Sequence, residues 1–132
     1  MAFFHMPPAE FKEAYEKMKL GDHSVIYEHG SIGEKDEYFG ISNRPPHFFE
    51  KAVDNGWLKW IFCGHDHLNT LSLTYKGIRM TYGMSIDYLG YSGIAKQYIQ
   101  RGATLITRKT DGNIDITMVP LTTVVSTRVR GA

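Results

Sequence analysis

The chain has 132 residues, 42% of them hydrophobic, which suffices for one core that buries roughly two-thirds of the unfolded surface, so we expect a single domain over residues 1–132. The formal net charge of +1 does not favour nucleic-acid binding, and Cys63, as the only cysteine, excludes internal disulfides and zinc clusters of several thiolates. No apolar stretch reaches the roughly 20 residues of a membrane span, so no membrane insertion is expected, and the sequence assigns no cellular compartment.

The first half of the chain is predicted to alternate strands and helices. Apolar residues recur at helical spacing after the double proline at 7–8, and Asn55-Gly56 is typical of a helix C-terminus. The predicted elements are, in order, a strand that ends at Phe4, a helix from Pro8 to about Gly21, a long loop over 22–46 with a short strand at 24–27, and a helix over 47–53.

The second half is predicted to be mainly β-structure. Lys76-Gly77 and the segment 110–113 have the turn chemistry of tight hairpins. The predicted strands cover 57–63, 70–75, 78–82, 103–109, 114–119 and 122–127, with a glycine-rich loop through Gly83, Gly90 and Gly93. We assign Trp57, Trp60, Ile61 and Phe62 to the sheet and its packing.

The segment Gly64-His65-Asp66-His67 is the strongest candidate for chemistry. It directly follows a predicted strand, and ligands of α/β proteins gather at the carboxyl ends of strands. Two histidines two residues apart in extended backbone point to one side, and Gly64 would let the backbone turn closely. Because neutral imidazole is a good ligand for zinc and iron, this pair predicts a metal site.

Three blocks of the sequence resemble the calcineurin-like metallophosphoesterases, in particular the branch of the small purple acid phosphatases. Residues 62–69 resemble the family's strand followed by Gly-His-x-His. Residues 3–7 look like its strand that ends in a metal-binding histidine, and residues 82–103 are similar to its glycine and tyrosine loop. The resemblance covers most of residues 3–106.

The resemblance implies which residues bind metal. His5 and His65 would bind the second of two metal ions, and His67 would bind the first; iron, zinc and manganese are all compatible with such ligands. Asp66 stands at a variable position and is not expected to be a ligand, and Asn69 is expected to brace the loop through its short amide. No catalytic residue is assigned in this chain.

The other ligand motifs of the family have no counterpart ahead of His5 in this chain. These are an Asp-x-His pair, a Gly-Asp block and an Asn-His pair, which precede the His-x-Pro histidine in the family. We therefore expect an α/β fold that forms the C-terminal half of an αββα sandwich, a mixed sheet flanked by helices. Without carboxylate ligands, the chain alone is expected to bind metal weakly and not to hydrolyse phosphate esters efficiently.

Two further residues are candidates for substrate binding, His29 and Tyr91. Tyr88 and Arg101 could equally line a substrate cleft or pack, and Cys63 is expected to be a buried thiol.

The implied partners are the missing N-terminal half of a longer parent and a phosphate ester substrate. An exposed sheet edge would also favour self-association, so sedimentation showing only monomer at micromolar concentrations would contradict this expectation. Two alternatives remain: a stand-alone metal-binding module without catalysis, and a domain with inert histidines that only packs against other proteins.

Overall fold

The computed structural model describes residues 1–41, 47–91 and 101–121 and divides into two compact units, Met1–Gly83 and Met84–Ala132. Each unit is described by itself, and the single domain expected over 1–132 stays a prediction. The strand predicted at 122–127 lies outside the described residues. Within the described part of the chain, no helix is both long and apolar enough to cross a bilayer.

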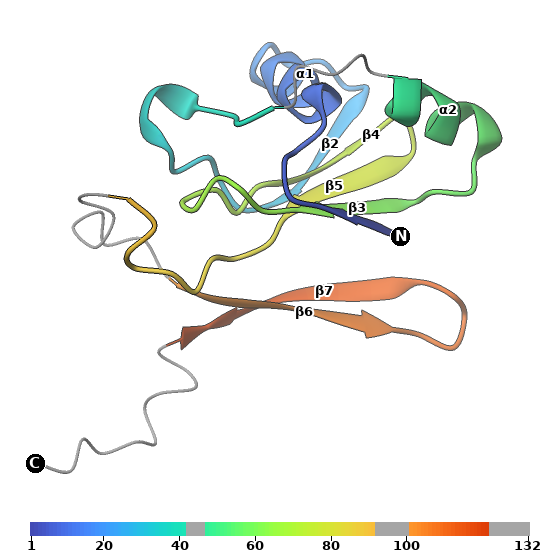
Figure 1. The fold of residues 1–132 in the computed structure, drawn as a ribbon. Coiled ribbons are helices and arrows are strands. Elements are labelled where there is room, and N and C mark those ends of the chain that lie inside the picture. Colours follow the sequence, from blue (N-terminus) through green and yellow to red (C-terminus); the bar gives the residue numbers. More distant parts are fainter. Residues whose placement is uncertain (42–46, 92–100, 122–132) are drawn as a thin grey trace, which may run out of the picture. The chain divides into compact units, whose positions relative to one another are not determined.

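The first unit is a five-stranded mixed sheet with two helices (Figure 1). Its elements are β1 (Ala2–Phe4), α1 (Ala9–Lys19), β2 (Val25–His29), the 3₁₀ turn η1 (Lys35–Glu37), α2 (His47–Asn55), β3 (Trp60–Cys63), β4 (Ser72–Tyr75) and β5 (Ile78–Tyr82). The spatial order is β1-β3-β5-β4-β2, in which β1, β3 and β5 are parallel and β4 is antiparallel to both of its neighbours. The predicted α/β class with a mixed sheet is confirmed, whereas the αββα sandwich stays a prediction.

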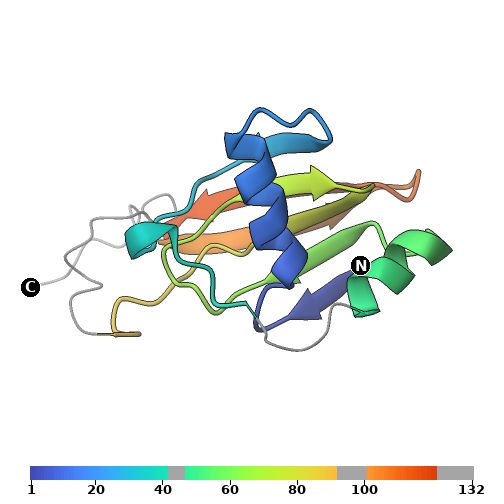
Figure 2. The ribbon, with the colours of Figure 1, turned by 90° about the horizontal axis from the view of Figure 1, so that it is seen from above.

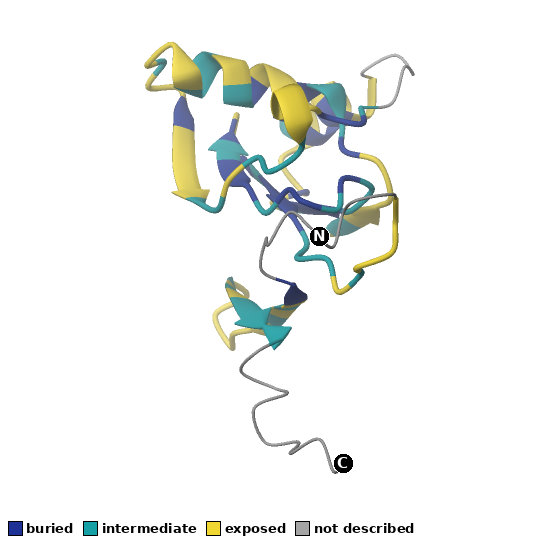
Figure 3. Cartoon of the chain, turned by 90° about the vertical axis from the view of Figure 1, so that its left-hand side faces the viewer, coloured by how far each residue is buried: buried dark blue, intermediate teal, exposed yellow. Residues whose placement is uncertain are grey.

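The core of this unit lies between the helices and one face of the sheet. Figure 2 shows α1 crossing the sheet and α2 lying near the N-terminal end, and Figure 3 shows the burial of their inner sides. Phe11 and Ala14 of α1 and Phe49 and Ala52 of α2 are buried there. Alternate strand residues face them, as the pleat requires. These strand residues are Ile61, Cys63, Leu73, Tyr75, Ile78, Met80 and Tyr82.

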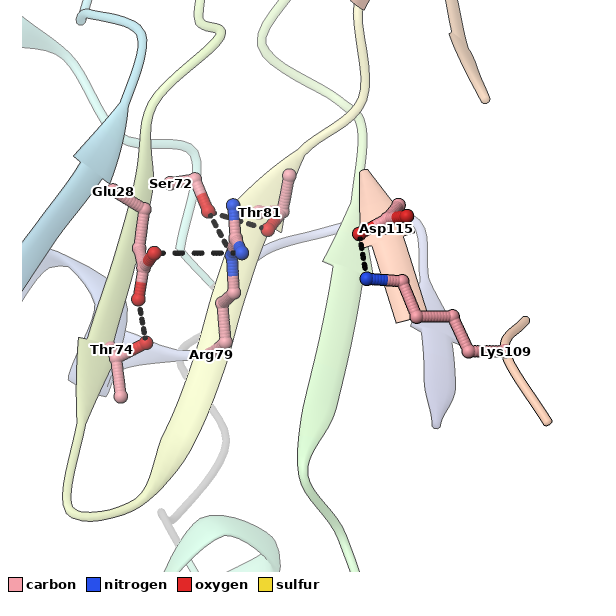
Figure 4. A network of polar contacts seen from close by, with 7 residues as sticks. All are labelled: Glu28, Ser72, Thr74, Arg79, Thr81, Lys109 and Asp115. Atoms are coloured by element: carbon pink, nitrogen blue, oxygen red, sulfur yellow. Dashed lines mark hydrogen bonds and ion pairs between the residues drawn. The ribbon is translucent and has the colours of Figure 1, made fainter. Parts of the chain in front are cut away.

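The alternate positions of the strands form a polar network across β2, β4 and β5 (Figure 4). Arg79 joins it at the centre: its Nε donates to Ser72 Oγ at 3.0 Å, and its guanidinium lies 3.5 Å from Glu28 Oε2. Thr74 Oγ1 donates to Glu28 Oε1 at 2.6 Å, and the hydroxyls of Ser72 and Thr81 are 2.8 Å apart. The sheet is therefore apolar toward the helices and polar at the alternate positions of β2, β4 and β5, whereas on β1 and β3 these positions hold Phe3 and Phe62, whose rings stack at 5.2 Å.

Local chemistry explains the element ends. Lys76 and Gly77 have φ values of 48° and 77°, the two left-handed positions that a tight β4–β5 turn requires. Gly56, with φ of 66°, follows α2 as predicted. The strand predicted to begin at Trp57 begins at Trp60 instead, and the Trp57 side chain is 62% exposed, so its assignment to the sheet was wrong.

The second unit contains the predicted C-terminal hairpin, formed by β6 (Gly102–Arg108) and β7 (Ile114–Pro120). In its turn, Asp111 Oδ1 accepts the backbone N–H of Asn113 at 2.9 Å, and Lys109 Nζ lies 2.7 Å from Asp115 Oδ1 (Figure 4). The turn sequence thus closes the hairpin through its own side chains, as Asp and Asn commonly do.

Candidate metal centre

The histidines His5 and His65 meet where two parallel strands end. His5 follows β1 and His65 lies two residues after β3, and Phe4 is paired with Cys63 in the register of these strands. The N–H of Gly64 donates to His5 O at 3.1 Å and extends the ladder by one step. Parallel neighbours have their carboxyl ends at one side of a sheet, which is why residues 60 positions apart come together.

The two imidazoles are as close together as two ligands of one metal ion. His65 Nδ1 lies 3.2 Å from His5 Nε2, and the rings are nearly perpendicular at 81°. Two imidazole nitrogens on a tetrahedral zinc ion, each about 2.0–2.1 Å from it, stand roughly 3.3 Å apart. In this structure the two nitrogens form a hydrogen bond, and their separation matches that of two ligands on a single zinc ion.

The backbone around His65 differs from the expected extended conformation. His65 itself has φ of 68°, in the left-handed region, and the N–H of Asp66 donates to Gly64 O at 2.9 Å across a tight turn. Gly64 is not in the left-handed region, and a Cβ there would meet only His5 O at 3.9 Å. The arguments from strand alternation and from the need for glycine at 64 were therefore wrong; the unusual conformation belongs to the histidine.

His67 is half-buried in the turn that follows, and its role as a ligand stays a prediction. Within the described residues there is no group of three or more His, Cys, Asp or Glu side chains arranged to hold a metal ion. The pair His5–His65 fits one ion, but two neutral imidazoles would leave the charge of that ion unbalanced. That the His5–His65 pair belongs to a metal site therefore stays a prediction.

Asp66 is buried and hydrogen-bonded in the interior. Its side chain is 5% exposed and accepts the N–H of Gly40, at 3.2 Å to Oδ1 and 3.0 Å to Oδ2, and the hydroxyl of Tyr82 at 2.5 Å. Burial raises the pKa of the Tyr82 phenol, and the hydrogen bond to Asp66 raises it further, so Tyr82 remains a donor at neutral pH. The hydrogen bonds engage both carboxylate oxygens of Asp66 in bracing the loop.

Asn69 braces the same loop, as the sequence predicted. It is completely buried; its Oδ1 accepts the N–H groups of Gly33 and Glu34 at 3.0 and 3.1 Å, and its Nδ2 donates to Tyr38 O at 3.1 Å. Glu34 Oε1 in turn accepts the N–H of Leu68 at 3.0 Å. Side chains from both segments therefore fasten residues 33–40 to residues 66–69.

The two candidates for substrate binding, His29 and Tyr91, belong to different units. His29 ends β2, the sheet edge opposite to β1, across four strand spacings of about 4.8 Å each. Its Nε2 is buried without a hydrogen-bond partner, and burial lowers the pKa of its imidazole, which Arg79 lowers further and Glu28 opposes. The structure therefore does not bring His29 together with the histidine pair, and the role of Tyr91, which belongs to the second unit, stays a prediction.

Arg101 and Cys63 have packing roles, each in its own unit. Arg101 is 2% exposed, and its guanidinium lies 5.7 Å from the centre of the Tyr88 ring. Cys63 is buried, as predicted, and burial raises the pKa of its thiol.

Part of the chain is similar to two proteins of Arabidopsis thaliana. It is 28% identical over 91 residues to probable inactive purple acid phosphatase 29, an alignment that covers 69% of this chain and 21% of that protein. It is 38% identical over 47 residues to probable inactive purple acid phosphatase 14, covering 36% of this chain and 12% of that protein. No family model and no solved structure matches the chain.

These similarities are to proteins named as purple acid phosphatases and cover part of the chain. Both relatives carry the word inactive in their names, and the chain spans only 21% and 12% of their lengths. The sequence resemblance to purple acid phosphatases is thus supported for part of the chain, by relatives whose own catalysis is in question.

Proposed function

We propose that this chain supplies histidine ligands to the metal site of a metal-dependent phosphoric ester hydrolase. His5 and His65 bind one metal ion and His67 binds a second, with iron, zinc or manganese as the candidate ions. The observation that carries the proposal is the 3.2 Å separation of His65 Nδ1 and His5 Nε2 at adjacent strand ends. The similarity to purple acid phosphatases gives this pair its functional context.

The role of the chain in such a site is to hold and orient ligands. Two metal ions supply charge that stabilises the phosphoryl group and activates its attacker. The imidazoles coordinate in their neutral form. No carboxylate of the described residues joins the pair, so the carboxylates come from another segment of a longer parent, and the chain alone binds metal weakly and turns over no phosphate ester efficiently.

The sheet edge formed by β1, next to His5, is a candidate site for association with a partner. Among the described strands, β1 pairs only with β3, and Phe3 on this edge strand is 63% exposed. An unpaired strand edge with exposed aromatic side chains favours association with another segment or a second copy. Self-association at micromolar concentrations is the expected result, and sedimentation is the measurement.

The names of the relatives favour a second candidate, a metal-binding or protein-interaction module without catalysis. The two candidates share the histidine pair and differ in what a longer parent does. Metal binding by a longer parent that shows no turnover of any phosphate ester would favour the module.

Calorimetric titration of the pure chain with zinc and manganese near neutral pH tests the proposal. We expect weak binding that is lost in a His65→Ala, His67→Ala double variant, and no metal-dependent hydrolysis of an activated aryl phosphate. A His23→Ala, His47→Ala variant serves as the matched control, because neither residue is among the proposed ligands. Equal metal binding by the unmutated chain and the double variant would refute the ligand assignment. Efficient turnover by the pure chain would refute the proposal that its metal site needs carboxylates from another segment.

A further inference from the structure

The ring of His65 rests against the backbone of Gly40. A methyl group added at Gly40 would overlap Cδ2 and Nε2 of this ring and come within 2.8 Å of Asp66 Oδ1. The nitrogen on the other side of the ring, Nδ1, is the one that lies 3.2 Å from His5. The imidazole is thus held between a glycine that has no side chain and the second histidine.

The position of Gly40 is fixed by Asp66 and the core. Both carboxylate oxygens of Asp66 accept the Gly40 N–H, and the same carboxylate accepts the Tyr82 hydroxyl. Tyr82 is completely buried and stacks on Phe11 at 4.9 Å between ring centroids. Phe39, directly before Gly40, packs on Phe11 at 5.8 Å. The glycine therefore has a fixed place relative to the sheet.

His65 needs such support because its own backbone is in the left-handed region, at φ of 68°. A residue with a Cβ occupies this region only where its surroundings stabilise it. Residues that orient metal-binding histidines commonly act by contact or hydrogen bonding from behind the ligand. Here the contact comes from a glycine backbone, and the hydrogen bonds secure that glycine.

We infer that Gly40, Asp66 and Tyr82 are positioning residues that turn Nδ1 of His65 toward His5. Asp66 acts through Gly40, and Tyr82 acts through Asp66, so neither touches the metal. The inference rests on the proposed function, because orienting His65 matters only if it binds metal. The orientation itself can be measured without metal. It assigns a role to the acidic residue between the two histidines of the segment 64–67.

The first test needs no metal and uses two glycine variants. Gly40→Ala places a methyl group in the space of the His65 ring, whereas Gly64→Ala, next to the same histidine, finds room. We expect nuclear Overhauser effects between the His5 and His65 rings in the unmutated chain and in Gly64→Ala. These effects should be lost in Gly40→Ala. Retained ring contacts in a folded Gly40→Ala variant would overturn the inference.

Tyr82→Phe provides a second test that keeps the ring and removes only the hydroxyl. We expect the amide of residue 40 to exchange its hydrogen at least about tenfold faster, because Asp66 loses the partner that fixes it. Unchanged exchange at this amide would overturn the inference even if Gly40→Ala does not fold.

Zinc titration separates this inference from the proposed function. We expect Gly40→Ala to weaken zinc binding about tenfold or more, and Gly64→Ala to leave it within about twofold. If His5 and His65 of the unmutated chain do not bind zinc, the proposed function is refuted. The contacts between the His5 and His65 rings still test whether Gly40 orients His65. If the unmutated chain and Gly40→Ala bind zinc equally strongly, the positioning role of Gly40 is overturned, while the proposed function stands.

Discussion

Replacing Phe11 by alanine is expected to lower the free energy of unfolding by about 3–5 kcal/mol, the range for a large aromatic side chain removed from a core. Phe11 of α1 is completely buried, stacks on Tyr82 at 4.9 Å and meets Phe39 edge-on at 5.8 Å. The variant leaves a cavity between α1, β5 and the segment that precedes Gly40. Urea unfolding followed by circular dichroism measures the loss.

Phe48→Ala is the matched control for this prediction. Phe48 lies on α2, is 42% exposed and makes one edge-on ring contact with Phe4 at 5.1 Å. Its loss is expected to cost about 1 kcal/mol. If the two variants lost equal stability, the core would not be centred on Phe11, and the description of how α1 packs on the sheet would be wrong.

Replacing Asn69 by alanine is expected to lower the free energy of unfolding by about 3 kcal/mol, because backbone groups of Gly33, Glu34 and Tyr38 lose their buried partner. The loss falls mainly on the segment 33–40. Denaturant unfolding gives the total, and hydrogen exchange of the amides of residues 33 and 34 shows where the structure opens.

Asn55→Ala is the corresponding control. The Asn55 side chain makes one exposed hydrogen bond, from Nδ2 to Lys51 O at 2.7 Å in the last turn of α2. We expect a change of about 0.5–1 kcal/mol. Slow, unchanged exchange at residues 33 and 34 in Asn69→Ala would contradict the bracing role of this amide, whatever the total stability.

Elements with strong local chemistry were predictable from the sequence. The turn at Lys76-Gly77 requires left-handed backbone at both positions, and Asp111 closes the β6–β7 turn through its own carboxylate. The order of strands was not predictable, because β1 and β3 pair over a separation of about 60 residues and no local pattern specifies that pairing. The same holds for β2, whose place at the far edge depends on β4.

The candidate site shows the same division. The rule that strand ends gather ligands, together with the family resemblance, led to His5 and His65, and the structure brings these two together. No signal in the sequence indicated the hydrogen bonds that Asp66 accepts from Gly40 and Tyr82. These residues are 26 and 16 positions away from Asp66, and no local pattern specifies such contacts. The left-handed backbone of His65 was also unpredictable, because residues other than glycine rarely have positive φ and no local pattern marks this histidine as one that does.

The most direct test of the central claim is a zinc titration of the pure chain near neutral pH, observed at the ring nitrogens of its histidines by nuclear magnetic resonance. The account predicts that Nε2 of His5 and Nδ1 of His65 change together as zinc is added, while the ring nitrogens of His23 and His47 do not. Zinc that binds without affecting either of the first two nitrogens, or ring nitrogens that all stay unchanged, would contradict the assignment of this pair as metal ligands.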